Sequence, residues 1–201
     1  MRLGFIGPAD TDSAALEAAA KLLIIEYEVD QVVYLGEDQA LQDFVATHGP
    51  SGDGEEDSAL LEQRVARVAA TGSPTDIGNL VRRLRSERYL EKLRVAPSPP
   101  TRLMEMLDDR IVLIVRLKAS IGEEDVVNSN VVIYGDAREL LFKRFGPRCF
   151  FSPGPLQGGL LGILDDESEA GGVELKAVDV EGKVIWTEPI QGRGAKVMVA
   201  P

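Results

Sequence analysis

Acidic side chains follow three short apolar runs of the sequence. Asp10 comes after the run 2–6, Glu37 after 31–35, and Asp136 after 131–134. Three carboxylates that converge at strand ends can hold one hard divalent cation, such as Mg²⁺ or Ca²⁺, through oxygen. The pattern therefore indicates a candidate single-cation site made of Asp10, Glu37 and Asp136.

Nitrogen and sulfur donors are scarce in this chain. The one histidine, His48, lies in a Gly-rich acidic segment away from the three runs, and the one cysteine is Cys149. One histidine is too few for a metal site built on several imidazoles. Cys149 begins an apolar Cys-Phe-Phe run without a neighbouring histidine, so we interpret it as a small buried hydrophobe and not as a nucleophile.

The first half of the chain reads as alternating strands and helices. Residues 2–6 and 31–35 are apolar runs of strand length, and each is followed by a helical pattern, to about residue 28 and about residue 46. The Gly-rich segment 48–57 is predicted to be a loop. Further helices are predicted at these positions: 60–70, 76–93 and 102–107.

The second half is richer in strand patterns. Residues 111–115 and 131–134 are almost continuously apolar, which is typical of strands covered on both faces. Residues 179–182 are predicted to form a hairpin turn through their Glu-Gly pair. Shorter strands are predicted at 140–145, 148–151, 160–164, 173–180 and 183–187. The fold class is therefore α/β, with a two-sheet β-sandwich flanked by helices.

Four motifs resemble, in order and spacing, the calcineurin-like metallophosphoesterase superfamily. They are Arg-Leu-Gly-Phe-Ile-Gly-Pro-Ala-Asp (2–10), Val-Val-Tyr-Leu-Gly-Glu (32–37), Val-Val-Ile-Tyr-Gly-Asp-Ala-Arg (131–138) and Cys-Phe-Phe-Ser-Pro-Gly-Pro-Leu (149–156). The sequence looks most similar to the small members, which are the bacterial phosphodiesterase type and the eukaryotic retromer scaffold subunit. The resemblance implies a four-layer αββα arrangement and a single domain over residues 1–201.

The resemblance also implies which metal ligands this chain lacks. In that superfamily two divalent metals clamp a phosphate and generate a hydroxide nucleophile. Pro8 and Asp10 fall where Asp-x-His is expected, Glu37 falls at the bridging Asp, and Asp136 and Arg138 fall at the two histidines of Gly-His-x-His. Pro8 has no ligating atom, and Arg138 brings a permanent cation to a metal position.

Two further ligand segments differ as well. The Gly-Asn-His-Asp segment expected near 94–100 reads Val-Ala-Pro-Ser-Pro-Pro at 95–100, and the histidine expected after 111–115 is missing from Arg116-Leu117-Lys118. The resemblance therefore implies a pseudoenzyme with no metal cofactor, which acts as a protein-binding scaffold or regulator.

Two alternatives stay open. One is a divergent metal-dependent phosphoesterase with a remodelled carboxylate site, and the other is a phosphate-ligand sensor that uses Arg138. If neither applies, Arg138 is expected to lie among Asp10, Glu37 and Asp136 as their counter-charge.

Charge and composition limit the class of partner. With 22 basic and 33 acidic residues the net charge is −11, which disfavours nucleic acid, and the basic run 82–94 is interpreted as a solvated helix face. A single cysteine and the absence of a signal-like start favour the cytoplasm, and the apolar runs are too short for membrane insertion. A protein partner is expected at 95–100 or 156–164, where polar substitutions of Leu160 or Leu161 are predicted to weaken binding more than folding.

Overall fold

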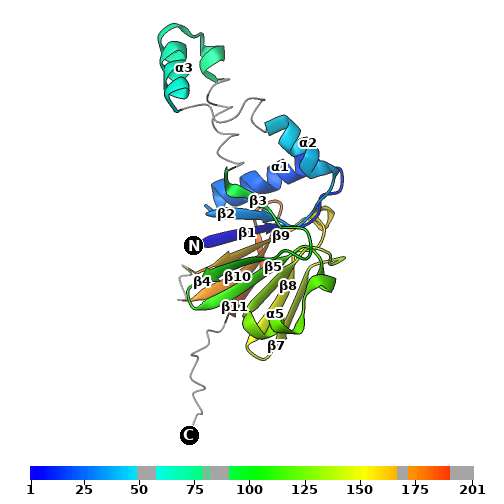
Figure 1. Ribbon diagram of the computed structural model, residues 1–201. Coiled ribbons are helices and arrows are strands. Elements are labelled where there is room, and N and C mark those ends of the chain that lie inside the picture. The colour runs from blue at the N-terminus through cyan, green and yellow to red at the C-terminus, as the bar shows by residue number, and fades with distance from the viewer. Residues whose placement is uncertain (49–57, 79–80, 82–90, 167–171, 191–201) are drawn as a thin grey trace.

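The computed structural model describes residues 1–48, 58–78, 81, 91–166 and 172–190. Their strands form two mixed sheets that pack face to face (Figure 1). The six-stranded sheet has the order β11-β10-β9-β1-β2-β3, formed by β1 Arg2–Ile6, β2 Gln31–Tyr34, β3 Leu93–Val95, β9 Leu160–Asp165, β10 Val173–Asp179 and β11 Val184–Ile190. The five-stranded sheet has the order β4-β5-β6-β8-β7, formed by β4 Leu103–Leu107, β5 Arg110–Val115, β6 Val131–Tyr134, β7 Leu141–Phe145 and β8 Arg148–Ser152.

Helices cover the outer face of the six-stranded sheet, and one short helix lies beside the other sheet. On the six-stranded sheet lie α1, Ser13–Lys21, its π-helical continuation Leu22–Glu26, and α2, Gln39–His48 (Figure 1). The short helix α5, Glu123–Asn128, lies beside the five-stranded sheet. Helix α3, Ser58–Thr71, stands apart from this body (Figure 1). The predicted two-sheet sandwich flanked by helices is confirmed.

Strand alternation divides the apolar side chains among three clusters. Leu3 and Phe5 of β1 point between the sheets, where they meet Ile114 and Phe151 of the other sheet. Ile6, on the opposite face of β1, packs under the helices. A third cluster lies on the outer face of the five-stranded sheet and consists of Leu113, Val115, Val132 and Tyr134. The alternation of side chains along each strand thus places one apolar set between the two sheets and the other set on their outer faces.

Parallel pairing brings several strand ends to one edge of the sandwich. In one sheet β1 pairs with β2 and β2 with β3, all parallel, and in the other β5 pairs with β6 and β6 with β8, also parallel. Because parallel strands end on the same side of a sheet, the segments after β1, β2, β5 and β6 can approach one another there.

Two secondary-structure predictions were wrong. Residues 102–107 were expected to be helical but form β4, which pairs antiparallel with β5 and has its exposed methionines alternating with inward residues. The helix expected over 76–93 does not extend to its predicted end, because Leu93 begins strand β3. Most of that prediction, and the loop expected at 48–57 apart from His48, lie outside the described residues.

The surface prediction for 156–164 was wrong at its centre. Strand β9 lies between β1 and β10, the side chain of Leu161 is fully buried among the residues under the helices, and Leu164 on the opposite face is buried between the sheets. Leu160 is half-buried. In the other predicted segment Val95 is exposed and Ala96 is buried. The turn predicted at 179–182 is confirmed, with the Gly182 N–H donating to the Asp179 carbonyl at 3.0 Å.

No helix in the described ranges is long and apolar enough to cross a bilayer.

Candidate functional site

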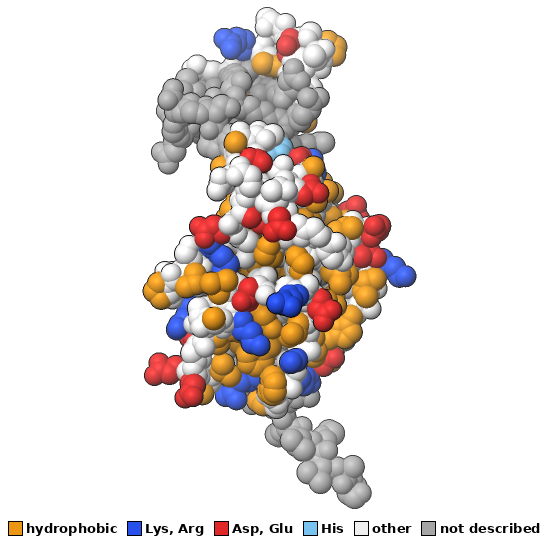
Figure 2. Space-filling view, turned by 90° about the vertical axis from the view of Figure 1, so that its right-hand side faces the viewer, with side chains coloured by type: hydrophobic (Ala, Val, Ile, Leu, Met, Phe, Trp, Pro, Cys, Tyr) orange, Lys and Arg blue, Asp and Glu red, His pale blue; other side chains and the backbone are white. Residues whose placement is uncertain are grey.

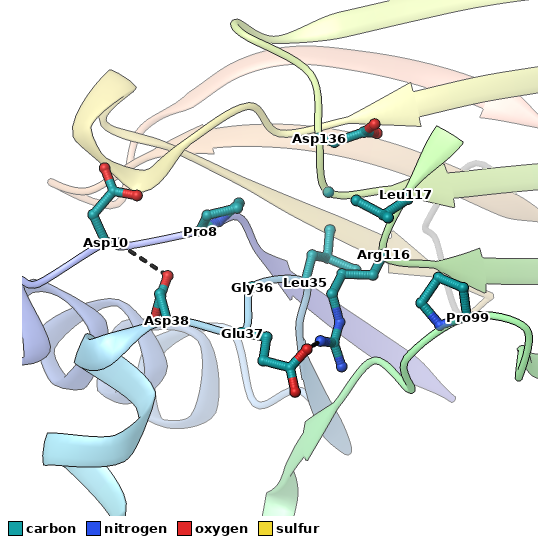
Figure 3. Close-up of a pocket in the computed structure, with 11 residues that line it drawn as sticks. Pro8, Asp10, Leu35, Gly36, Glu37, Asp38, Pro99, Arg116, Leu117 and Asp136 are labelled. Atoms are coloured by element: carbon teal, nitrogen blue, oxygen red, sulfur yellow. Dashed lines mark hydrogen bonds and ion pairs between the residues drawn. The ribbon is translucent and has the colours of Figure 1, made fainter. Parts of the chain in front are cut away.

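A pocket of about 360 Å³ opens where the strand ends meet (Figure 3). Its walls come from the segments after β1, β2, β5 and β6, together with Pro99 from the segment after β3. The lining residues are Pro8, Asp10, Leu35, Gly36, Glu37, Asp38, Pro99, Arg116, Leu117, Gly135 and Asp136. Four of the five residues that the sequence singled out, Pro8, Asp10, Glu37 and Asp136, are therefore brought to one pocket.

An ion pair joins the two sheets across this pocket. The Arg116 guanidinium, which follows β5, contacts the Glu37 carboxylate, which follows β2 (Figure 3). Arg116 is held in place because its Nη2 donates to the Ala96 carbonyl at 2.6 Å and its Nε donates to the same oxygen at 3.2 Å. The Arg116 side chain is 11% exposed, and its burial lowers its pKa from the usual value, whereas the Glu37 side chain is 63% exposed.

A second carboxylate, Asp38, is used for internal hydrogen bonds. Its Oδ2 accepts from the Tyr34 hydroxyl at 2.5 Å and from the backbone N–H groups of Ala9 and Asp10 at 3.0 and 2.9 Å. Its Oδ1 accepts from the Leu41 N–H at 3.2 Å. The Asp38 side chain thus links the segment after β1 to the start of α2. Both of its oxygens accept hydrogen bonds from within the protein.

Asp10 and Asp136 lie on different walls of the pocket (Figure 3). Asp10 has a left-handed backbone with φ of 56°, and its Oδ2 accepts from the Gln157 side-chain amide at 3.0 Å. Asp136 Oδ1 accepts from the Lys118 N–H at 2.8 Å. Across the described residues, no three or more His, Cys, Asp or Glu side chains are grouped closely enough to hold a metal ion.

The residues present therefore do not fit the pair of divalent metal ions that the resemblance implies. Pro8 offers no donor atom, and the Glu37 carboxylate already contacts a guanidinium. The candidate cation site made of Asp10, Glu37 and Asp136 is not assembled either, because the three side chains line one pocket without converging.

The expectation for Arg138 was wrong. Arg138 is exposed, does not line the pocket and makes no ion pair with any described residue. Arg116 supplies the counter-charge instead, because it follows β5 directly and so points across the sandwich toward the end of β2. In the sequence, Arg116 stands only where the resemblance expects a histidine. That substitution of a cation for a metal ligand was the signal that could have identified Arg116 as the counter-charge.

His48 is also placed differently from the prediction. It ends helix α2, where its ring lies 4.8 Å from the Phe44 ring and its Nε2 lies 3.1 Å from Glu17 Oε2. Tyr34 and Asp38 were missed altogether, since Tyr34 read only as part of an apolar strand and Asp38 as part of a turn.

The fold has known counterparts. No family model matches the sequence, and no curated protein matches it. Among solved structures, the YfcE phosphoesterase of E. coli covers 95% of this chain and 100% of its own, with a TM-score of 0.53 and 18% identity. A novel archaeal phosphodiesterase covers 89% of this chain and 100% of its own, with a TM-score of 0.50 and 15% identity. Vps29 of Chaetomium thermophilum covers 94% of this chain and 96% of its own, with a TM-score of 0.49 and 12% identity. The similarity to YfcE shows that this chain has the calcineurin-like metallophosphoesterase fold.

Removal of the Tyr34 hydroxyl is expected to weaken the fold and to change its response to alkali. Burial, and then the hydrogen bond to Asp38, raise the pKa of Tyr34 well above its usual value near 10. Its contribution is therefore complete below about pH 10, where an unfolded tyrosine is still neutral, and is lost as the pH rises further. Tyr34→Phe should lower the free energy of unfolding by about 1–2 kcal/mol at pH 7 and make the loss above pH 10 shallower.

Denaturant unfolding between pH 7 and pH 11 measures both effects. Tyr27→Phe is the comparison, because the Tyr27 hydroxyl donates to the Gly182 carbonyl at 2.7 Å and not to a carboxylate. Burial, and then the nearby Asp179 and Glu26 carboxylates, also raise the pKa of Tyr27, so both variants are compared with the parent at each pH. An unchanged pH 7 stability together with an unchanged alkaline slope in Tyr34→Phe would show that the Tyr34–Asp38 contact does not stabilise the fold.

Proposed function

We propose that this chain is a non-catalytic protein with the metallophosphoesterase fold, and that it works as a protein-binding scaffold or regulator. The observation that supports the proposal is the Arg116–Glu37 ion pair. Glu37 stands at the position that the resemblance assigns to the bridging carboxylate of two metals. A largely buried guanidinium beside that carboxylate repels a divalent cation and competes for the oxygen that would bind it.

The remaining pocket groups support the same proposal. Asp38 accepts four hydrogen bonds from the protein itself, and Pro8 cannot donate electrons to a metal. The pocket also has more acidic than basic side chains, since Asp10, Glu37, Asp38 and Asp136 face Arg116 alone. An acidic pocket disfavours a phosphate ligand, and Arg138 is not there to bind one.

Calorimetric titration with Mn²⁺ tests the proposal, in parallel with a phosphodiester reporter assay. The chain is expected to give no saturable heat and only background hydrolysis. Saturable Mn²⁺ binding, with turnover that disappears in Glu37→Ala or Asp136→Ala, would instead support the alternative of a divergent phosphoesterase with a remodelled site.

A pair of restored variants tests whether Arg116 is the obstacle. Pro8→Asp, Asp10→His, Glu37→Asp and Asp136→His are combined, once with Arg116 retained and once with Arg116→His. We expect Mn²⁺ binding to appear only with Arg116→His, because the histidine both removes the cation and adds an imidazole donor. Equal Mn²⁺ binding in the two variants would contradict the role given to Arg116.

A further inference from the structure

The outer face of the β7–β8 hairpin combines aromatic and basic side chains. Lys143 lies opposite Phe150, and Phe145 lies opposite Arg148, in the antiparallel register of the two strands. Their sequence neighbours Phe142 and Phe151 pack into the cluster between the sheets, so strand alternation directs these four side chains outward. We call Lys143, Phe145, Arg148 and Phe150 the hairpin patch.

The apolar part of the hairpin patch is open to water. The Phe145 side chain is 61% exposed, and its ring meets the half-buried Phe150 ring edge-on at 5.6 Å between centroids. Near it, the backbone carbonyl of the 62% exposed Val127 accepts from Arg148 Nη2 at 3.2 Å. Seen from the right-hand side of Figure 1, the surface of the body shows hydrophobic side chains among both basic and acidic ones (Figure 2). An exposed aromatic ring that packs against a half-buried one is a typical anchor point for a partner protein.

The charge of the hairpin is opposite to that of the whole chain. Residues 141–150 contain Lys143, Arg144 and Arg148 but no Asp or Glu, although the chain carries a net charge of −11. Arg144 points the other way, and its Nη2 lies 2.7 Å from Glu188 Oε1 on β11. Lys143 is exposed, and within the described part of the chain its ammonium has no ion-pair partner. The outward cations are therefore complementary to an acidic ligand.

Strand β7 is also an edge of its sheet. It pairs with β8 on one side, and no described strand pairs with it on the other. An edge strand offers backbone N–H and C=O groups to an added strand. At the opposite edge, β4 exposes Met104 and Met106 without an adjacent outward cation on that strand, so exposed apolar surface, positive charge and a free edge coincide at β7.

We propose that the hairpin patch and the β7 edge bind an extended acidic segment of a partner protein, which adds to the five-stranded sheet beside β7. Backbone pairing supplies the ladder of hydrogen bonds, carboxylates face Lys143 and Arg148, and an apolar side chain covers Phe145. The ladder favours a peptide over a nucleic acid, because a polynucleotide has no amide backbone to pair with the edge. The inference rests on the proposed binding role but does not depend on the state of the metal pocket.

Fluorescence anisotropy with a labelled synthetic peptide of about ten residues, in which glutamate is interspersed with valine, tests this proposal. We expect saturable binding to the full chain, weakened roughly tenfold or more by Phe145→Ser and by Lys143→Glu. Met106→Ser is the matched control, because Met106 is 67% exposed on the opposite edge strand, and it should leave the affinity unchanged. Circular dichroism of each variant separates lost binding from lost folding.

Two altered peptides test the two halves of the mechanism. Replacement of glutamate by lysine should abolish binding through charge, and replacement of alternate valines by proline should abolish it by removing backbone donors. The proposal is overturned if the acidic peptide fails to bind, if the lysine or proline peptide binds equally well, or if a single-stranded oligonucleotide binds more tightly at the hairpin patch. Such a failure would leave the Mn²⁺ result untouched, so the two proposals fail separately.

Discussion

Leu161→Ala is expected to lower the free energy of unfolding by about 2–5 kcal/mol, because it leaves a cavity in a closed part of the core. Leu161 is fully buried on β9, a strand paired on both sides, and its side chain belongs to the cluster between the six-stranded sheet and the helices. Its register partner on β10 is Val178, which is also fully buried. Equilibrium denaturation in urea measures the change.

Leu160→Ala is the matched control, since Leu160 is the preceding residue of the same strand but is only half-buried. Truncation there should have a clearly smaller effect, because less apolar area is removed from a protected environment. Equal losses at the two positions would contradict the difference in burial. A normal stability in Leu161→Ala would contradict the central place of β9 in the sheet.

Gly7→Ala is expected to have a comparable or larger effect, a loss of at least about 3 kcal/mol, with failure to fold as the extreme case. A methyl group on Gly7 would lie 1.7 Å from the Gly154 carbonyl oxygen and 2.8 Å from its carbon. Both atoms belong to the backbone, so no side-chain rotation can relieve the overlap. The adjacent hydrogen bond from the Leu156 N–H to the Pro8 carbonyl, at 2.8 Å, holds the two segments at this separation.

Gly158→Ala provides the comparison for this substitution. No heavy atom lies within 4 Å of a methyl group built on Gly158, and its backbone does not require a positive φ. The free energy of unfolding of Gly158→Ala is therefore expected to stay within about 1 kcal/mol of the parent value. A small increase is favoured, because alanine reduces the conformational entropy of the unfolded chain. Thermal unfolding of the two variants side by side gives the answer, and a tolerated Gly7→Ala would show that the segments after β1 and β8 can separate.

The close approach at Gly7 joins the segments that follow β1 and β8. Gly7 and Gly154 belong to two of the motifs that carry the resemblance, and here they bring two segments into backbone contact. Such a contact is needed to build the sandwich whatever the pocket binds. The fold can therefore be built independently of the chemistry of the site, and it does not by itself assign an activity.

Local sequence patterns determined most of the architecture. Continuous apolar runs such as 111–115 and 131–134 specify strands covered on both faces, and the order of strands and helices specifies a helix-flanked sandwich. The composition also limits the site, because a single histidine cannot supply the several imidazoles of the two-metal site that the resemblance implies. These properties depend on residue type and on short-range periodicity, which can be read along the chain.

Tertiary structure alone decided which charges meet. Arg116 and Glu37 lie 79 positions apart and on different sheets, so their ion pair depends on how the two sheets stack, whereas Arg138, closer in sequence to Asp136, turns to solvent. The same holds for β4. Its residues were predicted to be helical from sequence, and they form a strand because they pair with β5. Pairing across sheets and between strands is set by the packing of the whole core, and no local pattern specifies it.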